Sequence, residues 1–383
     1  MKNFDVIVVG LGAMGSATVR EVAARGARVL GLDRLRPPHT LGSTHGRSRI
    51  IREAYFEHPL YVPLVRRAYE KWDELSRLAR QELYVRTGGL MVGPAEGVLV
   101  SGALRSAREF GIDHELLDRD AMASRYPQFR LEPDWVALLE RRAGLLLPEA
   151  CIDASLALAR ASGAELRLEE AVLRWEAAGD GVRVIAERGS YEATHLVLAA
   201  GAWMPELLGG IVPLAVERQM LHWFEPVRGR ERFGPDRCPI ALWEYAPDRL
   251  FATFTDLGDG VKAGIHHEGE AAAPSSLRRT ITAEEDAMVR DLVARVLPDA
   301  AGPQLESRVC MYTNTPDGHF VIDRHPAHEA VTVVSACSGH GFKFASAIGE
   351  IAADLALDGG CRFDLAPFRL SRFAATNETA RAG

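Results

Sequence analysis

The chain has 383 residues, 47% of them hydrophobic, and a formal net charge of −7. This composition is typical of a globular protein with two domains, and the acidic balance argues against nucleic acid as a partner. The 5 cysteines are scattered without a C-x-x-C pair, which argues against a disulfide framework or a structural zinc site. No stretch resembles a membrane span or a secretory leader, so we expect a cytoplasmic protein with no membrane partner.

The first elements predict a unit that binds a dinucleotide. The β-rich run FDVIVV leads into GLGAMG at residues 10–15, then into a helical pattern and a second strand that ends in Asp33. In such a unit Gly10 permits a tight turn, Gly12 lets the backbone approach a pyrophosphate, and Gly15 lets helix and strand pack closely. The helix N-terminus attracts phosphates, and Asp33 can accept a hydrogen bond from a ribose hydroxyl. This order of parts is specific, but it does not separate NAD from FAD.

The middle of the chain predicts a return to this unit and then a different architecture. We expect helices at residues 60–80, 98–111, 150–162 and 283–296. An apolar strand at 195–200 is expected to lie beside the first strand. Between residues 211 and 320 short strands dominate, which is typical of a separate antiparallel sheet.

The end of the chain predicts a strand, a glycine-rich turn and a helix that belong again to the first unit. We therefore expect an α/β fold (α+β, two domains), with a Rossmann-like nucleotide-binding domain and an antiparallel-sheet substrate domain, both discontinuous in sequence. The expected nucleotide-binding domain comprises residues 1–80, 145–210 and 321–383, and the expected substrate domain comprises residues 81–144 and 211–320.

Two short strands carry residues capable of chemistry. In GVKAGIHH, Lys262, Gly264 and His266 share one face of a strand, and in RVCMYT, Cys310 and Tyr312 share a face of another. From spacing alone, surface side chains at a sheet edge are an equally good interpretation of Lys262 and His266. The glycine between them favours the close approach of a ligand.

Two further segments are rich in cations. Arg49 and Arg52 would lie on one side of a helix, and arginine is a natural bidentate partner of a carboxylate. Lys343 follows Gly339 and Gly341 and is expected in the first turn of a helix, where it suits an anion. The alternatives are a solvated basic loop for the arginines and a plain strand-to-helix turn with a surface lysine.

Several distinctive stretches, which occur in order, give the chain a family resemblance. They are FDVIVVGLGAMG, PPHTLGSTHGRSRIIREAY, YVPLVRRA, AGAWMPELL, VKAGIHH, RVCMYTNTPDGHFVID and SGHGFKFASAIGE. The chain resembles, over essentially its whole length, the family of monomeric sarcosine oxidase and N-methyltryptophan oxidase, within the D-amino-acid-oxidase-like flavoproteins. The resemblance implies FAD as the cofactor, bound by the Rossmann-like domain.

The resemblance also implies roles for particular residues. Cys310 stands where the family attaches FAD covalently, as a thioether to the flavin 8α-methyl carbon. Lys262 stands at the position of the lysine that activates oxygen, and His266 at that of a histidine in the substrate site. Arg52 and Lys343 match the pair that binds the substrate carboxylate.

Other matches and two departures complete the implied site. Arg49 and His45 match basic residues near the flavin ring that assist its attachment, and Tyr312 matches an aromatic wall of the pocket. Phe251 replaces a pocket tyrosine of the family and Ser48 replaces a threonine, which leaves the preferred substrate open. The implied cofactor-binding residues are Gly10, Gly12, Ala13, Met14, Gly15, Asp33, Arg34, His39, Ser43, Arg49, Val172, Gly201, Trp203, Cys310, Gly339, Gly341, Phe342 and Lys343.

The activity that the resemblance implies is oxidation of a secondary amino acid. Sarcosine or a similar N-methyl amino acid would give the primary amino acid, formaldehyde and hydrogen peroxide, with dioxygen as the acceptor and the enzyme as a monomer. The alternatives are oxidation of cyclic imino acids such as proline or pipecolate, or of larger N-alkyl or glycated amino acids. An NAD-dependent dehydrogenase and a flavoprotein without activity are the other classes. Cys310 and the late return of the chain to the nucleotide-binding domain disfavour the first. The second is disfavoured by the joint presence of Lys262, His266, Arg52, Lys343 and Cys310.

Overall fold

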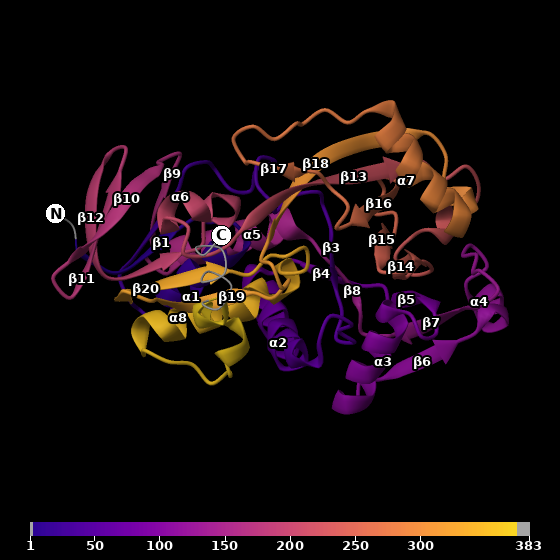
Figure 1. Ribbon diagram of the computed structural model, residues 1–383, viewed down its shortest axis with the longest axis horizontal. Helices are drawn as coiled ribbons and strands as arrows, with labels where there is room; N and C mark the ends of the chain where they lie inside the picture. The colour runs from indigo at the N-terminus through magenta and orange to yellow at the C-terminus, as the bar shows by residue number, and fades with distance from the viewer. Residues whose placement is uncertain (1–2, 374–383) are drawn as a thin grey trace, which may run out of the picture.

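The computed structural model describes residues 3–373, in which two large sheets lie side by side, each with its own helices (Figure 1). The first sheet contains the N-terminal strand and lies at the left of the view, and the second sheet lies at the right. A small third sheet, formed by β3 (Arg49–Ile51), β4 (Tyr84–Arg86) and β8 (Gly144–Leu146), lies between them.

The first sheet has a parallel centre. It consists of β1 (Asn3–Val9), β2 (Val29–Asp33), β9 (Glu165–Leu168), β10 (Val172–Ala178), β11 (Gly181–Ala186), β12 (Gly189–Leu198), β19 (Val321–His325) and β20 (His328–Ser335). β1 pairs in parallel with β2 and β12, β9 extends the parallel set beyond β2, and β20 extends it beyond β12. Val6, Ile7 and Val8 are fully buried, as expected for a strand covered on both faces.

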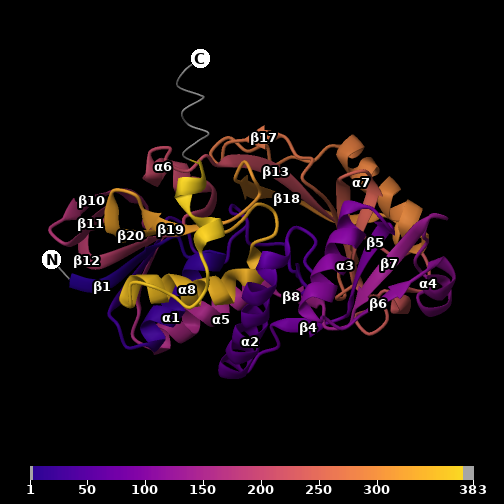
Figure 2. The ribbon, with the colours of Figure 1, turned by 60° about the horizontal axis from the view of Figure 1, so that its bottom comes forward.

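Four helices pack against one another beside this sheet. They are α1 (Ala13–Ala24), α2 (Val62–Ala79), α5 (Pro148–Ala161) and α8 (Ala345–Leu357), which Figure 2 shows gathered together. Helical spacing explains the packing of α2, because Val65, Ala68 and Trp72 fall on one buried face. Helix α1 begins directly after the glycine turn, so its N-terminus faces the end of β1.

The second sheet is mostly antiparallel. It consists of β5 (Gly89–Pro94), β6 (His114–Leu117), β7 (Trp135–Glu140), β13 (Ala215–Phe224), β14 (Ile240–Ala246), β15 (Arg249–Phe254), β16 (Val261–His266), β17 (Ala271–Ala272) and β18 (Gln304–Asn314). The pair of β5 and β14 is parallel. The remaining helices are α3 (Val98–Phe110), α4 (Arg119–Arg125), α6 (Met204–Leu208) and α7 (Ala283–Val296). Short 3-10 turns occupy Pro59–Tyr61, Gly201–Trp203, Arg230–Arg232, Pro298–Ala300, Phe342–Phe344, Ala366–Phe368 and Leu370–Phe373.

The two-domain α/β architecture confirms the predicted fold class, and four predicted helices correspond to α2, α3, α5 and α7. The predicted strand at 195–200 is the end of β12 and lies beside β1, as expected. Two local predictions were wrong. Arg49 begins strand β3 rather than a helix, and Lys343 lies in the 3-10 turn before α8, which begins at Ala345. None of the helices within residues 3–373 is long and apolar enough to cross a membrane.

Candidate active site

A long cavity runs between the two large sheets and is lined by both. Most of the residues that the sequence implied for the site line it, namely Gly10, Gly12, Ala13, Met14, Asp33, Arg34, His39, Ser43, Arg49, Arg52, Val172, Gly201, Trp203, Lys262, His266, Cys310, Tyr312, Gly339, Gly341, Phe342 and Lys343. Gly15, His45 and Phe251 are not among the lining residues. The structure thus brings together segments that lie far apart in the sequence.

The glycine turn leaves room where a diphosphate would lie. Gly10 has a φ of +87°, and a Cβ there would lie 2.6 Å from the carbonyl oxygen of Ala199. A Cβ at Gly15 would lie 1.7 Å from the Gly10 carbonyl oxygen, so this glycine serves close packing. A Cβ at Gly12 would meet nothing within 4 Å. Gly12 therefore leaves an open approach to the N-terminus of α1, which suits an anion.

Two carboxylates line the same end of the cavity. Asp33 accepts hydrogen bonds from the backbone N–H groups of Leu11 at 2.7 Å and Leu35 at 2.8 Å, and burial raises its pKa. Glu170 accepts a hydrogen bond from Tyr191 at 2.8 Å through Oε1, while its buried Oε2 has no hydrogen-bond partner among the described residues. The unpartnered Oε2 fits a donor on a bound nucleotide. Sequence reasoning missed Glu170, because a single acid in a loop carries no spacing signal.

Cys310 faces the cavity from the buried strand β18. Its side chain lies 3.3 Å from the carbonyl oxygen of Ser43, and Nη2 of Arg49 lies 3.6 Å from its sulfur atom. The same nitrogen of Arg49 donates a hydrogen bond to the Ser43 carbonyl at 2.9 Å. The thiol is therefore held between a carbonyl oxygen and a guanidinium, in a cavity where a cofactor ring can reach it.

Lys262 is buried on the neighbouring part of the cavity wall. Its Nζ donates hydrogen bonds to the carbonyl oxygens of Gly46 at 2.8 Å and Ser48 at 2.7 Å, and lies 3.0 Å from the Ser48 hydroxyl. Serine at position 48 thus provides the hydroxyl that the family's threonine has. Nζ also lies 4.2 Å from the centre of the Phe254 ring. Burial, and then the charge of Arg49, hold the pKa of Lys262 well below its usual value.

His45 is buried close to these cations but outside the cavity lining. It is 1% exposed, and neither ring nitrogen has a hydrogen-bond partner among the described residues. Burial, and then the charge of Arg49, lower its pKa to about 3, so the imidazole is neutral. A role for His45 beside the flavin remains a prediction.

Arg52 lies at the other end of the cavity and already has an anionic partner. Its guanidinium carbon lies 4.4 Å from the centre of the Tyr55 ring and 4.7 Å from that of Phe56. Its Nη2 donates to both carboxylate oxygens of Glu57, at 2.9 and 2.7 Å, and its Nη1 donates to the carbonyl of Ala54 at 2.9 Å. Sequence reasoning did not include Glu57.

Neighbouring cationic side chains keep the carboxyl group of Glu57 ionised. Burial alone would raise its pKa, but Arg52, His340 and Lys343 outweigh burial and lower the pKa to about 2. The Nζ of Lys343 donates to the carbonyl oxygen of His340 at 2.7 Å and lies 3.5 Å from the Tyr55 hydroxyl. Burial, and then the charge of Arg52, lower the pKa of Lys343 to about 7. Arg52 and Lys343 therefore form one cationic cluster, partly neutralised by Glu57.

His266 lines the same cavity, within electrostatic reach of Glu57 and Lys343. Its Nδ1 is 3.1 Å from the hydroxyl of Tyr312, and burial, followed by the charge of His267, holds its pKa well below the usual value. Gly339 has a φ of +77°, and a Cβ there would lie 2.7 Å from the His266 ring. The imidazole is therefore neutral and closely packed at the centre of the cavity.

The expectation that Phe251 lines the pocket was wrong, and the neighbouring Gly264 has a packing role as well. Phe251 is fully buried behind the cavity wall, with its ring centre 6.0 Å from that of Trp243, while its neighbour Ala252 lines the cavity. Gly264 does line the cavity, but a Cβ there would lie 2.9 Å from the carbonyl oxygen of Met220 in β13. The glycine therefore serves the close approach of two strands, and the expected approach of a ligand at Gly264 stays a prediction.

Glu140 is a further residue that sequence reasoning missed. It lies on β7 of the second sheet, is fully buried, and accepts hydrogen bonds from the N–H groups of Glu53 at 2.8 and 2.9 Å and of Ala54 at 2.8 Å. Burial raises its pKa to about 7, although these backbone donors lower it. Its carboxylate thus holds the backbone directly after Arg52.

The comparisons with known proteins agree with this arrangement. The family model described as FAD dependent oxidoreductase matches residues 5–355. The chain is 45% identical to monomeric sarcosine oxidase of Streptomyces avermitilis, over 97% of this chain and 98% of the relative. It is 36% identical to N-methyl-L-tryptophan oxidase of Salmonella heidelberg, over 97% of this chain and 100% of the relative.

Solved structures show the same fold. NikD, an unusual amino acid oxidase essential for nikkomycin biosynthesis, matches with a TM-score of 0.84 at 25% identity, over 96% of this chain and 98% of that chain. L-proline dehydrogenase from P. horikoshii matches with a TM-score of 0.85 at 20% identity, over 98% of this chain and 99% of that chain. At that identity the second match supports the fold alone.

Proposed function

The chain belongs to the family of FAD-dependent oxidoreductases, and we propose that it is an oxidase of secondary amino acids, with sarcosine or a similar N-methyl amino acid as substrate. The observation that carries this proposal is the composition of one cavity. It holds a carboxylate-binding cluster of Arg52 and Lys343, a neutral His266, and beyond it Lys262 and Cys310. We assign residues 3–80, 145–210 and 321–373 to FAD binding, and residues 81–144 and 211–320 to substrate binding; residues 1–2 and 374–383 of the expected nucleotide-binding domain lie outside the described part of the chain.

The residues present fit FAD. Gly12 leaves the N-terminus of α1 open to a diphosphate, and Asp33 and Glu170 offer acceptors for ribose and base donors. The proposed covalent link joins the sulfur of Cys310 to the 8α-methyl carbon of the flavin. The chemistry that FAD would supply when bound is two-electron oxidation of the substrate amine, with dioxygen as the final acceptor and hydrogen peroxide as the product.

Arg52 and Lys343 would bind the substrate carboxylate. A guanidinium and an ammonium on one anion give charge-assisted hydrogen bonds that fix its orientation. Nη2 of Arg52 is held by Glu57 at 2.7 Å, while its buried Nε has no hydrogen-bond partner among the described residues, so Glu57 would share Arg52 with the incoming carboxylate or give way to it. The substrate carboxylate would therefore compete with Glu57 for Nη2 and would also find in Nε a donor that is unpaired within residues 3–373.

The amine must be neutral at the moment of oxidation, because only the free amine has the lone pair that the reaction needs. Burial and the positive charges of Arg52 and Lys343 disfavour the ammonium form of a bound amine. His266 is neutral, which makes it a weak base that can position the amine through a hydrogen bond rather than remove its proton. Lys262 would supply a positive charge for the reaction with oxygen, from a side chain held by carbonyl oxygens.

A substrate panel followed by peroxide release tests the proposed activity. Sarcosine and N-methyl amino acids are expected to react faster than proline, pipecolate and fructosyl amino acids. A faster reaction with cyclic imino acids or glycated amino acids would replace the proposed substrate class. Absence of peroxide with every member, in a fully flavin-loaded preparation, would end the proposal.

Acid precipitation tests the proposed covalent link. The yellow chromophore is expected to stay with the wild-type pellet and to leave the pellet of Cys310→Ala. Cys337→Ala, which alters another cysteine of the same cavity, serves as the matched control and is expected to keep its colour in the pellet. Colour retained by Cys310→Ala would remove Cys310 as the attachment point.

Gel filtration tests our further proposal that the enzyme is a monomer, and cell fractionation tests its proposed cytoplasmic location.

A further inference from the structure

His266, the last residue of β16, and His267, which follows it, are contacted by two paired strands, β13 and β18. Glu217 of β13 lies directly opposite Tyr312 of β18 in the register of the sheet. The Tyr312 hydroxyl lies 3.1 Å from Nδ1 of His266, and a carboxylate oxygen of Glu217 lies 3.2 Å from Nδ1 of His267. Each member of this cross-strand pair thus binds one imidazole.

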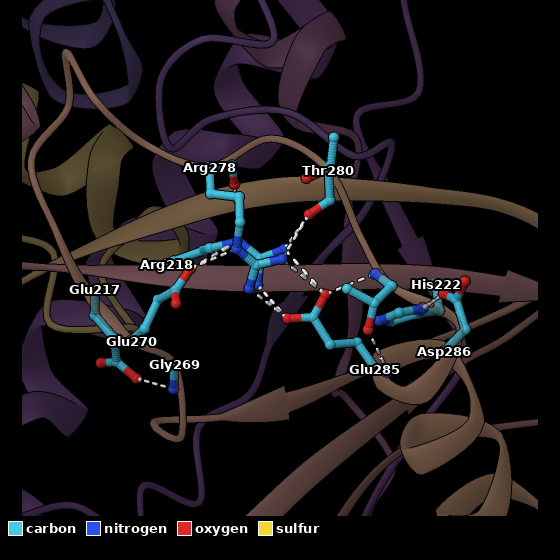
Figure 3. A network of polar contacts seen from close by, with 10 residues as sticks. Glu217, Arg218, His222, Gly269, Glu270, Arg278, Thr280, Glu285 and Asp286 are labelled. Atoms are coloured by element: carbon cyan, nitrogen blue, oxygen red, sulfur yellow. Dashed lines mark hydrogen bonds and ion pairs between the residues drawn. The ribbon is translucent and has the colours of Figure 1, made fainter.

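The carboxylate of Glu217 is the centre of a polar cluster. It accepts hydrogen bonds from the backbone N–H of Gly269 at 2.8 Å, which Figure 3 shows, and from the side-chain amides of Gln219 and Asn314 at 2.6 Å each. Burial alone would raise its pKa, but the hydrogen bonds from His267, Gly269 and Asn314 outweigh burial and lower it. Glu217 is therefore an ionised group with a fixed orientation.

The rings of the two histidines are packed against each other. Their centres are 4.2 Å apart, and the His267 ring centre lies 5.2 Å from that of Tyr312. A Cβ at Gly339 would lie 2.7 Å from His266 and 2.8 Å from His267, so only glycine leaves room for both rings. His267 has a φ of +59°, a left-handed conformation that costs about 1–2 kcal/mol outside glycine and directs the backbone back toward Glu217.

The segment after His267 has a second, independent attachment. Arg218, the neighbour of Glu217 on the opposite face of β13, donates to the carbonyl oxygens of Arg278 and Thr280 at 2.8 Å and lies 3.5 Å from Glu270 (Figure 3). The segment would therefore remain attached to the sheet without Glu217. The contact between Glu217 and His267 has a more local effect, on the imidazoles beside the cavity.

We propose that Glu217 is a positioning residue of the amine site that acts through His267: it fixes the His267 ring, which holds the His266 ring with Nδ1 on the Tyr312 hydroxyl. The remaining nitrogen of His266 is then the one left for the substrate amine. This inference rests on the proposed function in its assignment of His266 to the amine. Its structural part, the orientation of His266, does not depend on the substrate.

Three variants test the proposal in the flavin-loaded enzyme. They are Glu217→Gln, which removes the charge, His267→Asn, whose shorter side chain tolerates a positive φ, and the double variant. Each single variant is expected to lower kcat/KM for the amine substrate by about tenfold, as for loss of a charge-assisted contact. The double variant is expected to lose no more than His267→Asn, because Glu217 acts through His267. Additive losses would overturn this coupling.

Two readouts distinguish positioning from general damage. The affinity for a carboxylate analogue without an amine, (methylthio)acetate, is expected to stay within about twofold of wild type, because Arg52 and Lys343 are unchanged. In ¹⁵N-histidine NMR spectra, the His266 signal is expected to show one tautomer in the wild type and a mixture in Glu217→Gln. An unchanged His266 signal, or equal loss of analogue affinity, would refute the proposal.

The matched control is Glu270→Gln, which removes another carboxylate from the same segment on the Arg218 side. It is expected to keep wild-type kcat/KM and the wild-type His266 signal. If it reproduces the Glu217→Gln effects, Glu217 merely attaches the segment and the proposal fails. Because the NMR signal is measured without substrate, an inactive wild-type enzyme with the expected tautomer change would refute only the proposed function.

Discussion

Lys262 and Arg52 are buried cations of the same cavity, and they differ in what holds them. Lys262 is held by two backbone carbonyl oxygens and a hydroxyl, which are neutral acceptors that no ligand displaces easily. Arg52 is held by the carboxylate of Glu57, the same functional group as the proposed ligand brings. The comparison indicates that neutral backbone and hydroxyl oxygens hold Lys262, whereas an anion that a ligand can compete with holds Arg52.

The largest expected effect comes from replacing Lys262, and it falls on the reaction with oxygen. Lys262→Met should slow the reaction of the reduced enzyme with oxygen by about 10³-fold, as expected for loss of a preorganised charge at a reacting centre. Anaerobic bleaching by substrate should change far less, because the carboxylate cluster is intact. Stopped-flow absorbance separates the two half-reactions. Equal slowing of both would show that Lys262 does not serve oxygen in particular.

Replacing Arg52 should instead weaken the binding of carboxylate ligands. Arg52→Ala is expected to raise the dissociation constant of (methylthio)acetate by about 10²-fold, as for loss of a bidentate charge-assisted contact. Its reduced form should still react with oxygen at close to the wild-type rate. Spectral titration measures the first quantity and stopped-flow oxidation the second. A normal dissociation constant would remove Arg52 from the carboxylate site.

The affinity of the Arg52–Lys343 cluster for a carboxylate should also depend on pH. Burial, and then Arg52, lower the pKa of Lys343 to about 7, so in the free protein its ammonium loses its proton as the pH rises through that value. Because a carboxylate binds the protonated form better, affinity for the analogue should be full below pH 7 and should weaken by up to about tenfold per pH unit above it. Titrations at several pH values check the slope, and Lys343→Met should abolish it. A flat wild-type profile would contradict the predicted titration.

The smallest expected effect is a gain in affinity for the carboxylate analogue. Glu57→Gln removes the competing carboxylate from Arg52, so the analogue should bind about three- to tenfold more tightly, a change of about 1 kcal/mol. Isothermal titration calorimetry measures the change, and Glu53→Gln is the control, because the Glu53 side chain pairs with Arg66 and Arg142 rather than with Arg52. Weaker binding in Glu57→Gln would mean that Glu57 positions Arg52 rather than competing for it.

The sequence predicted the parts of the site that carry a pattern. The glycine turn has a fixed order of strand, turn and helix, and Cys310 and Lys262 lie in distinctive stretches, so the amino-acid sequence is enough to locate them. Phe251 was misplaced because the direction of a strand side chain depends on register, and here Ala252 faces the cavity. Glu57 could not be assigned as the partner of Arg52, because only the folded chain shows which acid reaches a given cation.

Isolated acids illustrate the same limit more strongly. Glu140 and Glu217 lie on strands of the second sheet, and neither belongs to a motif. Their partners are backbone N–H groups and side chains that tertiary structure brings to them. Position in the sequence says nothing about such contacts, whereas burial and hydrogen-bond geometry in the folded chain identify them directly.

The carboxylate of Glu140 connects the second sheet to the backbone beside Arg52. It extends from a strand of the second sheet, and the backbone that it grips is the stretch immediately after Arg52. Recognition of the anionic end of the substrate therefore depends on the seam between the two halves of the molecule staying closed. In mild denaturant, loosening of that seam is expected to abolish binding of a carboxylate analogue, whereas a flavin held by the proposed thioether at Cys310 would stay with the chain.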